Sequence, residues 1–260
     1  MSLLYWKHLL VRTPLEGPAK KLQYLAALPR RLKHPELREL HLEDARVHQA
    51  MRRLIQPASN CIDIGCHIGS TLSLMLRLAP HGKHFAFEPV PHKAQWLQKK
   101  FPEVTIHQMA LSDTPGPLTF TENLTRPGFS GLISTTAPKD QTRQFTVNCD
   151  RLDNVLPPDH RVDFIKVDVE GAELLVLRGA VQTIKRSHPP IIFESGPAGA
   201  AKFGLTRPQL FSFLTTDLGY SIYFFKDFLS NSSPLDLAAF ESAARYPFKA
   251  FNYLALRRSL

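Results

Sequence analysis

The chain has 260 residues, of which 43% are hydrophobic, enough to build one large domain or a domain with an appendage. No apolar run approaches the ~18 residues of a membrane-spanning helix, and the opening apolar residues do not read as a signal peptide. The formal charge of +9 is concentrated at the start of the chain, where residues 1–60 hold eleven Lys and Arg against five Asp and Glu.

This basic segment has the composition of a surface that meets an anionic membrane or an acidic partner, and also that of a solvated helical face. Its basic residues are not interleaved with stacking aromatic side chains, so we expect no nucleic acid partner. The three cysteines are odd in number and form no C-x-x-C pair, which is typical of a reducing, cytoplasmic compartment. We therefore expect a cytoplasmic protein, with peripheral contact of residues 1–34 with the inner face of the membrane as an alternative.

Three prolines interrupt residues 1–34, which we expect to be irregular or loosely helical. Apolar residues recur at helical spacing over 35–55 and predict an amphipathic helix. We therefore divide the chain into a basic helical extension, residues 1–56, and a main domain, residues 57–260.

Strands and helices alternate through much of the main domain, which predicts a mostly parallel α/β sheet covered on both faces. We expect strands at 61–64, 83–87, 104–109, 162–168, 191–194, 220–225 and 251–256, and helices at 70–79, 91–100, 172–185, 207–217 and, as one short helix, within 226–250. Two β-rich runs, 118–122 and 143–149, interrupt this order and predict an antiparallel hairpin. The polar loop 123–140 between them could cover an active site and carries Asn123, Arg126 and Ser130.

A glycine turn joins the strand at 61–64 to its helix. A dinucleotide-binding turn needs G-x-G-x-x-G, but His67 and Ser70 occupy the second and third glycine positions counted from Gly65. The spacing from Asp63 to Gly69 is instead D-x-G-x-x-x-G, which suits a ligand without phosphate. We therefore predict a site for S-adenosylmethionine rather than for a nicotinamide dinucleotide, although such glycines are often only turn residues.

Each part of the predicted cofactor site has a chemical reason. Gly65 and Gly69 would let the backbone approach the methionine end, Glu88 would accept hydrogen bonds from the ribose hydroxyls, and Ala110 with Leu111 would flank the adenine. The candidate cofactor-binding residues are Asp63, Gly65, Cys66, His67, Gly69, Glu88, Pro89, Ala110 and Leu111. Cys66 and His67 have no second Cys or His at ligand spacing, so we expect no metal there.

Three acids follow strands that should end at the same edge of the sheet. Asp168 and Glu170 lie in the segment Lys-Val-Asp-Val-Glu-Gly, and Glu194 ends the next strand. Ligands of open α/β sheets bind at this edge, so these acids are the candidate catalytic bases, with His67 as an outside alternative. We expect Lys166 to pair with a neighbouring acid. Three carboxylates could also hold Mg²⁺, but the paired motif of metal-dependent O-methyltransferases is missing, so we predict no required metal.

Five segments of the chain resemble the FkbM family of S-adenosylmethionine-dependent methyltransferases: 63–69, 87–89, 110–113, 165–173 and 177–180. The resemblance runs from about residue 43 to 200. It implies a Rossmann-like seven-stranded sheet with an antiparallel last strand, and O-methylation of sugar or polyketide hydroxyls. The family usually has Gly-Ala-Asn where this chain has Gly65-Cys66-His67, so the contacts at the methionine end should differ.

We therefore expect an S-adenosylmethionine-dependent O-methyltransferase that acts on a small-molecule or glycan hydroxyl, foremost a saccharide or glycoconjugate. A polyketide or other secondary-metabolite hydroxyl is the first alternative. A non-catalytic cofactor-binding scaffold in a biosynthetic complex is the second, because of the altered Cys66-His67 pair.

Overall fold

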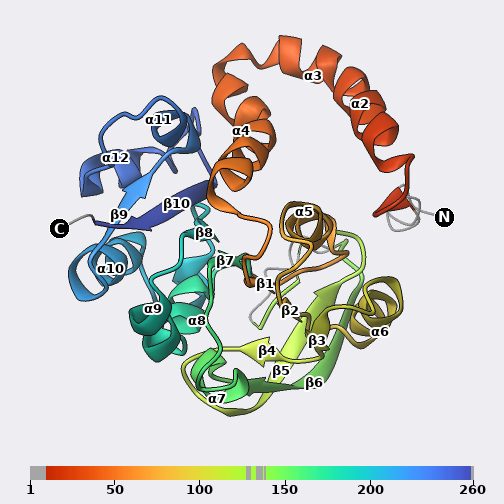
Figure 1. The fold of residues 1–260 in the computed structure, drawn as a ribbon. Helices are drawn as coiled ribbons and strands as arrows, with labels where there is room; N and C mark the ends of the chain where they lie inside the picture. Colours follow the sequence, from red (N-terminus) through yellow and green to blue (C-terminus); the bar gives the residue numbers. More distant parts are fainter. Residues whose placement is uncertain (1–9, 127–129, 133–136, 138, 259–260) are drawn as a thin grey trace.

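A seven-stranded sheet forms the centre of the molecule (Figure 1). The computed structural model describes residues 10–126, 130–132, 137 and 139–258. In spatial order the strands are β3 (Thr105–His107), β2 (Phe85–Phe87), β1 (Cys61–Ile64), β7 (Phe164–Val167), β8 (Ile191–Glu194), β10 (Asn252–Arg257) and β9 (Tyr220–Tyr223). β10 runs antiparallel to both neighbours and the other pairs are parallel. The predicted Rossmann-like α/β fold with an antiparallel last strand is confirmed.

Helices cover both faces of the sheet because its central strands are apolar on both sides. One face packs against α8 (Glu173–Arg178), α9 (Val181–Ser187), α10 (Arg207–Ser212) and α12 (Leu237–Ser242). The other packs against α4 (Arg38–Leu54), α5 (Ser70–Leu78), α6 (Pro91–Lys100) and α11 (Phe225–Leu229). Successive strand residues alternate between the two cores, so Ile62 and Ile165 belong to the first and Cys61 and Phe164 to the second.

Three expectations about local structure need correction. The helix expected at 172–185 is two helices, α8 and α9, which meet at Gly179. The carbonyl of Ser112 lies so close to Gly179 that no side chain fits there, and the Gly179 carbonyl accepts a hydrogen bond from the Asp153 amide at 3.0 Å. The region 226–250 holds parts of two helices rather than one, since α11 begins at Phe225 and α12 follows it. The helix at 207–217 changes after α10 into a π-helical turn, Phe213–Asp217.

The predicted antiparallel hairpin is confirmed and belongs to a second, three-stranded sheet. Its long strands, β5 (Gly116–Asn123) and β6 (Thr142–Asp150), pair along their full length. A short strand that the sequence did not indicate, β4 (Ala110–Leu111), pairs parallel to β6. β4 follows β3 along the chain, so the small sheet begins where β3 ends. The loop that connects β5 to β6 leaves the small sheet beside the main sheet.

The N-terminal segment is more helical than expected. From residue 16 onward α2 (Glu16–Ala26), α3 (Leu28–Lys33) and a 3₁₀ turn (Pro35–Leu37) lead into α4, and Figure 1 shows them forming an arch beside the main domain. In the part of the chain that the structure describes, no helix is long and apolar enough to cross a membrane.

Glu43 attaches the base of this arch to the sheet. Its carboxylate accepts hydrogen bonds from the amides of Phe251 and Asn252, at 2.8 and 3.1 Å, and from the Asn252 side chain at 2.9 Å. Glu43 is only 9% exposed, and Phe251 and Asn252 are half-buried, so water can replace these hydrogen bonds only in part. Buried donors that lose their acceptor are costly to the folded state.

We expect Glu43→Ala to lower the free energy of unfolding by about 2–4 kcal/mol, because three donors lose a charged acceptor. Urea unfolding monitored by circular dichroism measures this change. The control is Asp217→Ala, at an exposed position, which should stay within about 0.5 kcal/mol of the parent. Equal stability of the two variants would contradict the assigned role of Glu43.

Candidate active site

A cavity of about 560 Å³ opens at the carboxyl ends of β1, β2 and β7 and extends under the loop that follows β5. This is the edge at which open α/β sheets bind ligands. Eight of the predicted site residues line it: Gly65, His67, Glu88, Pro89, Ala110, Leu111, Asp168 and Glu170. The other four, Asp63, Cys66, Gly69 and Glu194, are placed behind its wall or beside it.

The glycine turn after β1 has two glycines with different tasks. Gly65 has φ +76°, and the carbonyl of Asp168 lies where its Cβ would stand, so a side chain is excluded. Gly69 also has φ +76°, but its missing side chain makes room for the ring of Phe101, which follows α6. Gly65 thus brings the cavity wall against the end of β7, whereas Gly69 serves the packing of α5 on α6. His67 also has positive φ, +51°, and lines the cavity.

Glu88 is held rigidly at the cavity wall. Its Oε2 accepts a hydrogen bond from the His67 amide at 2.9 Å, and its Oε1 accepts one from the Val90 amide at 3.0 Å. Burial raises the pKa of Glu88 to about 7, although the charge of Lys93 and these hydrogen bonds act in the opposite direction. Each carboxylate oxygen can accept a second hydrogen bond. Glu88 can therefore receive two hydroxyl groups of a ligand.

Lys166 connects the ends of β1 and β7. The register of the two strands sets Asp63 opposite Lys166, whose Nζ lies 3.5 Å from Asp63 Oδ1 and 3.0 Å from Asp168 Oδ2. The same ammonium donates to the Gly65 carbonyl at 3.4 Å. Burial opposes its charge, but the two carboxylates outweigh burial and raise the pKa of Lys166. The expected pairing of Lys166 with a neighbouring acid is confirmed.

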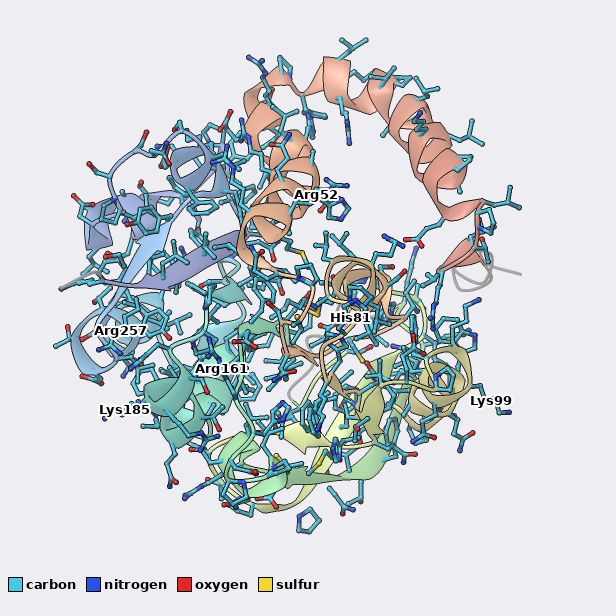
Figure 2. All side chains as sticks on the ribbon, in the orientation of Figure 1. Arg52, His81, Lys99, Arg161, Lys185 and Arg257 are labelled. Atoms are coloured by element: carbon cyan, nitrogen blue, oxygen red, sulfur yellow. The ribbon has the colours of Figure 1, made fainter. Side chains whose placement is uncertain are left out.

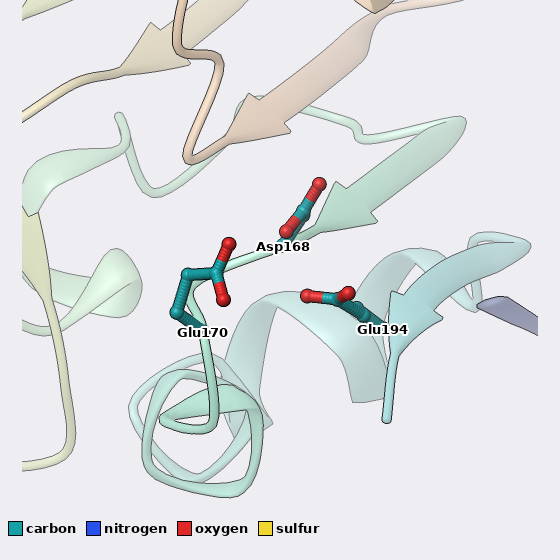
Figure 3. Close-up of side chains that lie close together, drawn as sticks. All are labelled: Asp168, Glu170 and Glu194. Atoms are coloured by element: carbon teal, nitrogen blue, oxygen red, sulfur yellow. The ribbon is translucent and has the colours of Figure 1, made fainter. Parts of the chain in front are cut away.

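The three predicted edge acids lie together, as Figure 3 shows. One carboxylate oxygen from each of Asp168, Glu170 and Glu194 lies within 4.8 Å of the other two. Burial, followed by the charges of Asp168 and Glu170, raises the pKa of Glu194 well above its usual value, and Glu194 shares a hydrogen bond with Asp168. This shift favours Glu194, rather than Asp168, as the hydrogen-bond donor of the pair.

Asp168 and Glu170 differ in their ionisation. Burial favours protonation of Asp168, but the Lys166 ammonium and the hydrogen bond from Glu194 outweigh it and lower the pKa of Asp168. Burial and the charges of Asp168 and Glu173 raise the pKa of Glu170 to about 8. Glu170 has φ +58°, a strained conformation for a residue with a side chain. Such strain is frequent at functional sites.

Glu173 has a structural role at the start of a helix. It is the first residue of α8, and its Oε1 accepts hydrogen bonds from the Val169 and Gly171 amides at 3.1 and 3.0 Å. These contacts shape the loop that carries Glu170. Glu173 itself is not part of the cavity wall.

The loop after β5 closes one side of the cavity with Thr125, Arg126, Ser130, Gly131 and Leu132. Arg126 is paired to Asp140, with Nε to Oδ1 at 3.0 Å. Asn123 does not line the cavity: its side-chain oxygen accepts from the Thr125 and Arg126 amides at 3.1 and 2.7 Å. Of the three loop residues singled out in the sequence, two therefore face the cavity and Asn123 folds the loop. Residues 127–129, 133–136 and 138 lie outside the described part of the chain.

Sequence reasoning missed much of the apolar wall. The additional lining residues include Phe87, Val90, Met109, Phe120, Leu132 and Val169. Met109 and Val169 adjoin predicted site residues and could have been found by their position. Phe120 and Leu132 reach the cavity only because the hairpin packs beside the main sheet. No local sequence pattern predicts this packing.

The Methyltransferase FkbM domain model matches residues 63–222. Methyltransferase sdnD of Sordaria araneosa is 31% identical over 202 residues, which cover 62% of this chain and 73% of that protein. The 2-O-methyltransferase NoeI of Sinorhizobium fredii is 26% identical over 162 residues, 55% of this chain and 66% of that protein.

A solved structure, methyltransferase FkbM from Methylobacillus flagellatus, has a TM-score of 0.48 and 16% identity, over 78% of this chain and 44% of that one. The family model spans well over half of the chain, and its match begins at the glycine turn and includes the edge acids. The chain belongs to the FkbM methyltransferase family.

Proposed function

We propose that this protein is an S-adenosylmethionine-dependent O-methyltransferase that acts on a hydroxyl group, foremost of a saccharide or glycoconjugate. The observation that carries the proposal is the cavity at the sheet edge, where Glu88 stands on one wall and Glu170 on another. Membership of a methyltransferase family supports the reaction class. The relative NoeI, a 2-O-methyltransferase, supports oxygen as the methylated atom.

The cavity fits the cofactor in size and in the chemistry of its wall. Glu88, with a free acceptor position on each oxygen, is suited to the two ribose hydroxyls. Met109, Ala110 and Leu111 form an apolar surface suited to an adenine ring. Gly65 and His67 lie on the side where we place the methionine end. Asp63, Cys66 and Gly69 act indirectly, by shaping the turn.

When bound, the cofactor supplies a methyl group already activated by a positive sulfonium. The protein must then align the acceptor hydroxyl and remove its proton. Among the edge acids, Asp168 is already engaged by Lys166 and Glu194, and the raised pKa of Glu194 favours its protonated form. Glu170 faces the cavity and has a pKa of about 8, close to the working pH of a general base. We therefore assign the base to Glu170.

The polar side of the cavity supports a saccharide acceptor. Thr125, Arg126 and Ser130 offer hydroxyl and guanidinium groups, which suit a sugar with several hydroxyls. Phe120 and Leu132 add apolar surface on the same side and favour the second candidate, a polyketide or other secondary-metabolite hydroxyl. Methyl transfer to a panel of both acceptor classes distinguishes the candidates, whereas cofactor binding without turnover on any of them indicates a scaffold.

We expect Glu88→Gln to weaken S-adenosylmethionine and S-adenosylhomocysteine binding about tenfold or more, because charge-assisted hydrogen bonds are lost. Calorimetry measures this affinity. Parent affinity should also rise with pH through about 7, as Glu88 loses its proton, and this dependence should vanish in Glu88→Gln.

The matched control is Glu173→Gln. Glu173 is as buried as Glu88 and also accepts two backbone hydrogen bonds, but it lies off the cavity. The Glu173→Gln variant should therefore bind the cofactor with unchanged affinity. An unchanged affinity in Glu88→Gln would contradict the placement of the ribose.

We expect Glu170→Gln to lower the single-turnover rate by about 10²–10⁴-fold with cofactor binding intact, the usual contribution of a general base. The base acts only when deprotonated, so the parent rate should rise with pH and level off above about 8. Glu194→Gln keeps a hydrogen-bond donor toward Asp168 and should retain most of the rate. If Glu194→Gln or Asp168→Asn lowers the single-turnover rate more than Glu170→Gln does, the residue replaced in that variant is the base instead.

We expect no dependence on a divalent metal. Burial raises the pKa of Glu194 in the Asp168–Glu170–Glu194 cluster and favours its neutral form, and the Lys166 ammonium already balances Asp168. Both features reduce the attraction for Mg²⁺. Dialysis against EDTA should therefore leave the methyl-transfer rate unchanged, whereas a loss that Mg²⁺ restores would show that the cluster binds metal.

A further inference from the structure

The outer side of the arch carries a row of exposed leucines. Leu15, Leu22, Leu25 and Leu32 are 61%, 69%, 57% and 79% exposed. They are half of the eight large hydrophobic residues exposed in the described part of the chain, yet they lie within 18 residues of sequence. Such a concentration is unusual, because scattered single residues are the norm on a protein surface.

Two of the leucines share one face of α2. At 100° per residue, Leu22 and Leu25 lie about 60° apart, and Glu16 lies on the opposite side of α2. Leu15 is in the turn before α2, and Leu32 is on α3. Glu16 is buried against α5, where Arg77 Nη1 lies 3.2 Å from its Oε2. A cavity under the arch is lined by other residues, among them Ala19 and Arg31. The exposed leucines of α2 therefore point away from this cavity. Figure 2 shows that side chains extend from the outer side of α2 and α3.

Basic residues accompany these leucines. Lys21 lies beside Leu22 on α2, and Lys33 beside Leu32 at the end of α3; both lysines are exposed. The first 60 residues carry +6 of the total charge of +9. Exposed leucines next to lysines form the pattern of a helix that lies in the interface of an anionic membrane.

Both ends of the arch are fixed to the main domain. At one end Arg12 pairs with Glu103 and donates to the Lys100 carbonyl at 3.2 Å. At the other, Glu43 holds α4 to β10. The leucine face is therefore presented by a supported scaffold, which lowers the ordering cost of binding.

We propose that α2 and α3 dock the protein on an anionic lipid surface, with the leucines entering the headgroup region and the lysines contacting lipid phosphates. A second copy of the chain fits this face less well, because a symmetric dimer would bring two basic segments together. The proposal is independent of the catalytic assignment, since the arch residues concerned lie outside the active-site cavity.

Flotation of the full chain with vesicles of phosphatidylcholine, alone or mixed with phosphatidylglycerol, tests this proposal. We expect binding to the mixed vesicles only, decreasing with salt. Lys21→Gln with Lys33→Gln should weaken binding about 25-fold, about fivefold per charge. Leu22→Asn with Leu32→Asn should weaken it about tenfold or more.

Matched controls use residues of the same type elsewhere on the surface. Leu118→Asn with Leu237→Asn, and Lys83→Gln with Lys185→Gln, change exposed leucines and lysines outside the arch and should leave flotation unchanged. Unchanged circular dichroism and cofactor affinity show that each variant is folded. Equal flotation of the arch and control variants would overturn the proposal. A second result would also overturn it. In that result, analytical ultracentrifugation shows a dimer of the parent protein, and the leucine variant is monomeric but floats with the vesicles as well as the parent does.

Discussion

The buried ammonium of Lys166 is the interaction on which the active site depends. It lies between Asp63 and Asp168, at the point where β1 and β7 reach the carboxyl edge of the sheet. Asp63 is fully buried and Lys166 is 9% exposed. Burial raises the pKa of Asp63 and the Lys166 ammonium opposes this shift, so the charged form of each residue depends on the other. Because neighbouring strands supply the pair, the strand register and the charge balance of the site depend on each other.

The charges of the acidic cluster follow from this ammonium. Lys166 keeps Asp168 ionised, and an ionised Asp168 in turn favours the protonated form of Glu194. The charge of Lys166 also acts to lower the pKa of Glu170, but burial and the charges of Asp168 and Glu173 outweigh it and raise this pKa. The pKa values of Asp168, Glu170 and Glu194 are thereby shifted by different causes. One cluster can therefore contain both a carboxylate that stays ionised, Asp168, and a general base, Glu170.

Backbone groups determine the opposite wall of the cavity. The turn at Gly65 has no room for a side chain because the end of β7 approaches it, and the same turn directs the His67 amide toward Glu88. The position of Glu88 therefore depends on the glycine turn as well as on its own strand. The altered Cys66-His67 pair leaves this arrangement intact, since the contact to Glu88 comes from the backbone of His67 rather than from its side chain.

The sequence by itself determined the alternation of strands and helices, the glycine turn and the acids that end strands, because each depends on neighbours within a few residues. The sequence was therefore sufficient to predict the sheet and to place four acids at one edge of it: Glu88, Asp168, Glu170 and Glu194. Only the tertiary structure decided which of these acids face the cavity, because that depends on how the strands and loops around them pack. It also decided the break at Gly179, the apolar wall from Phe120 and the outward leucines of the arch. Desolvation and distance between segments set these features, and neither is encoded in local spacing.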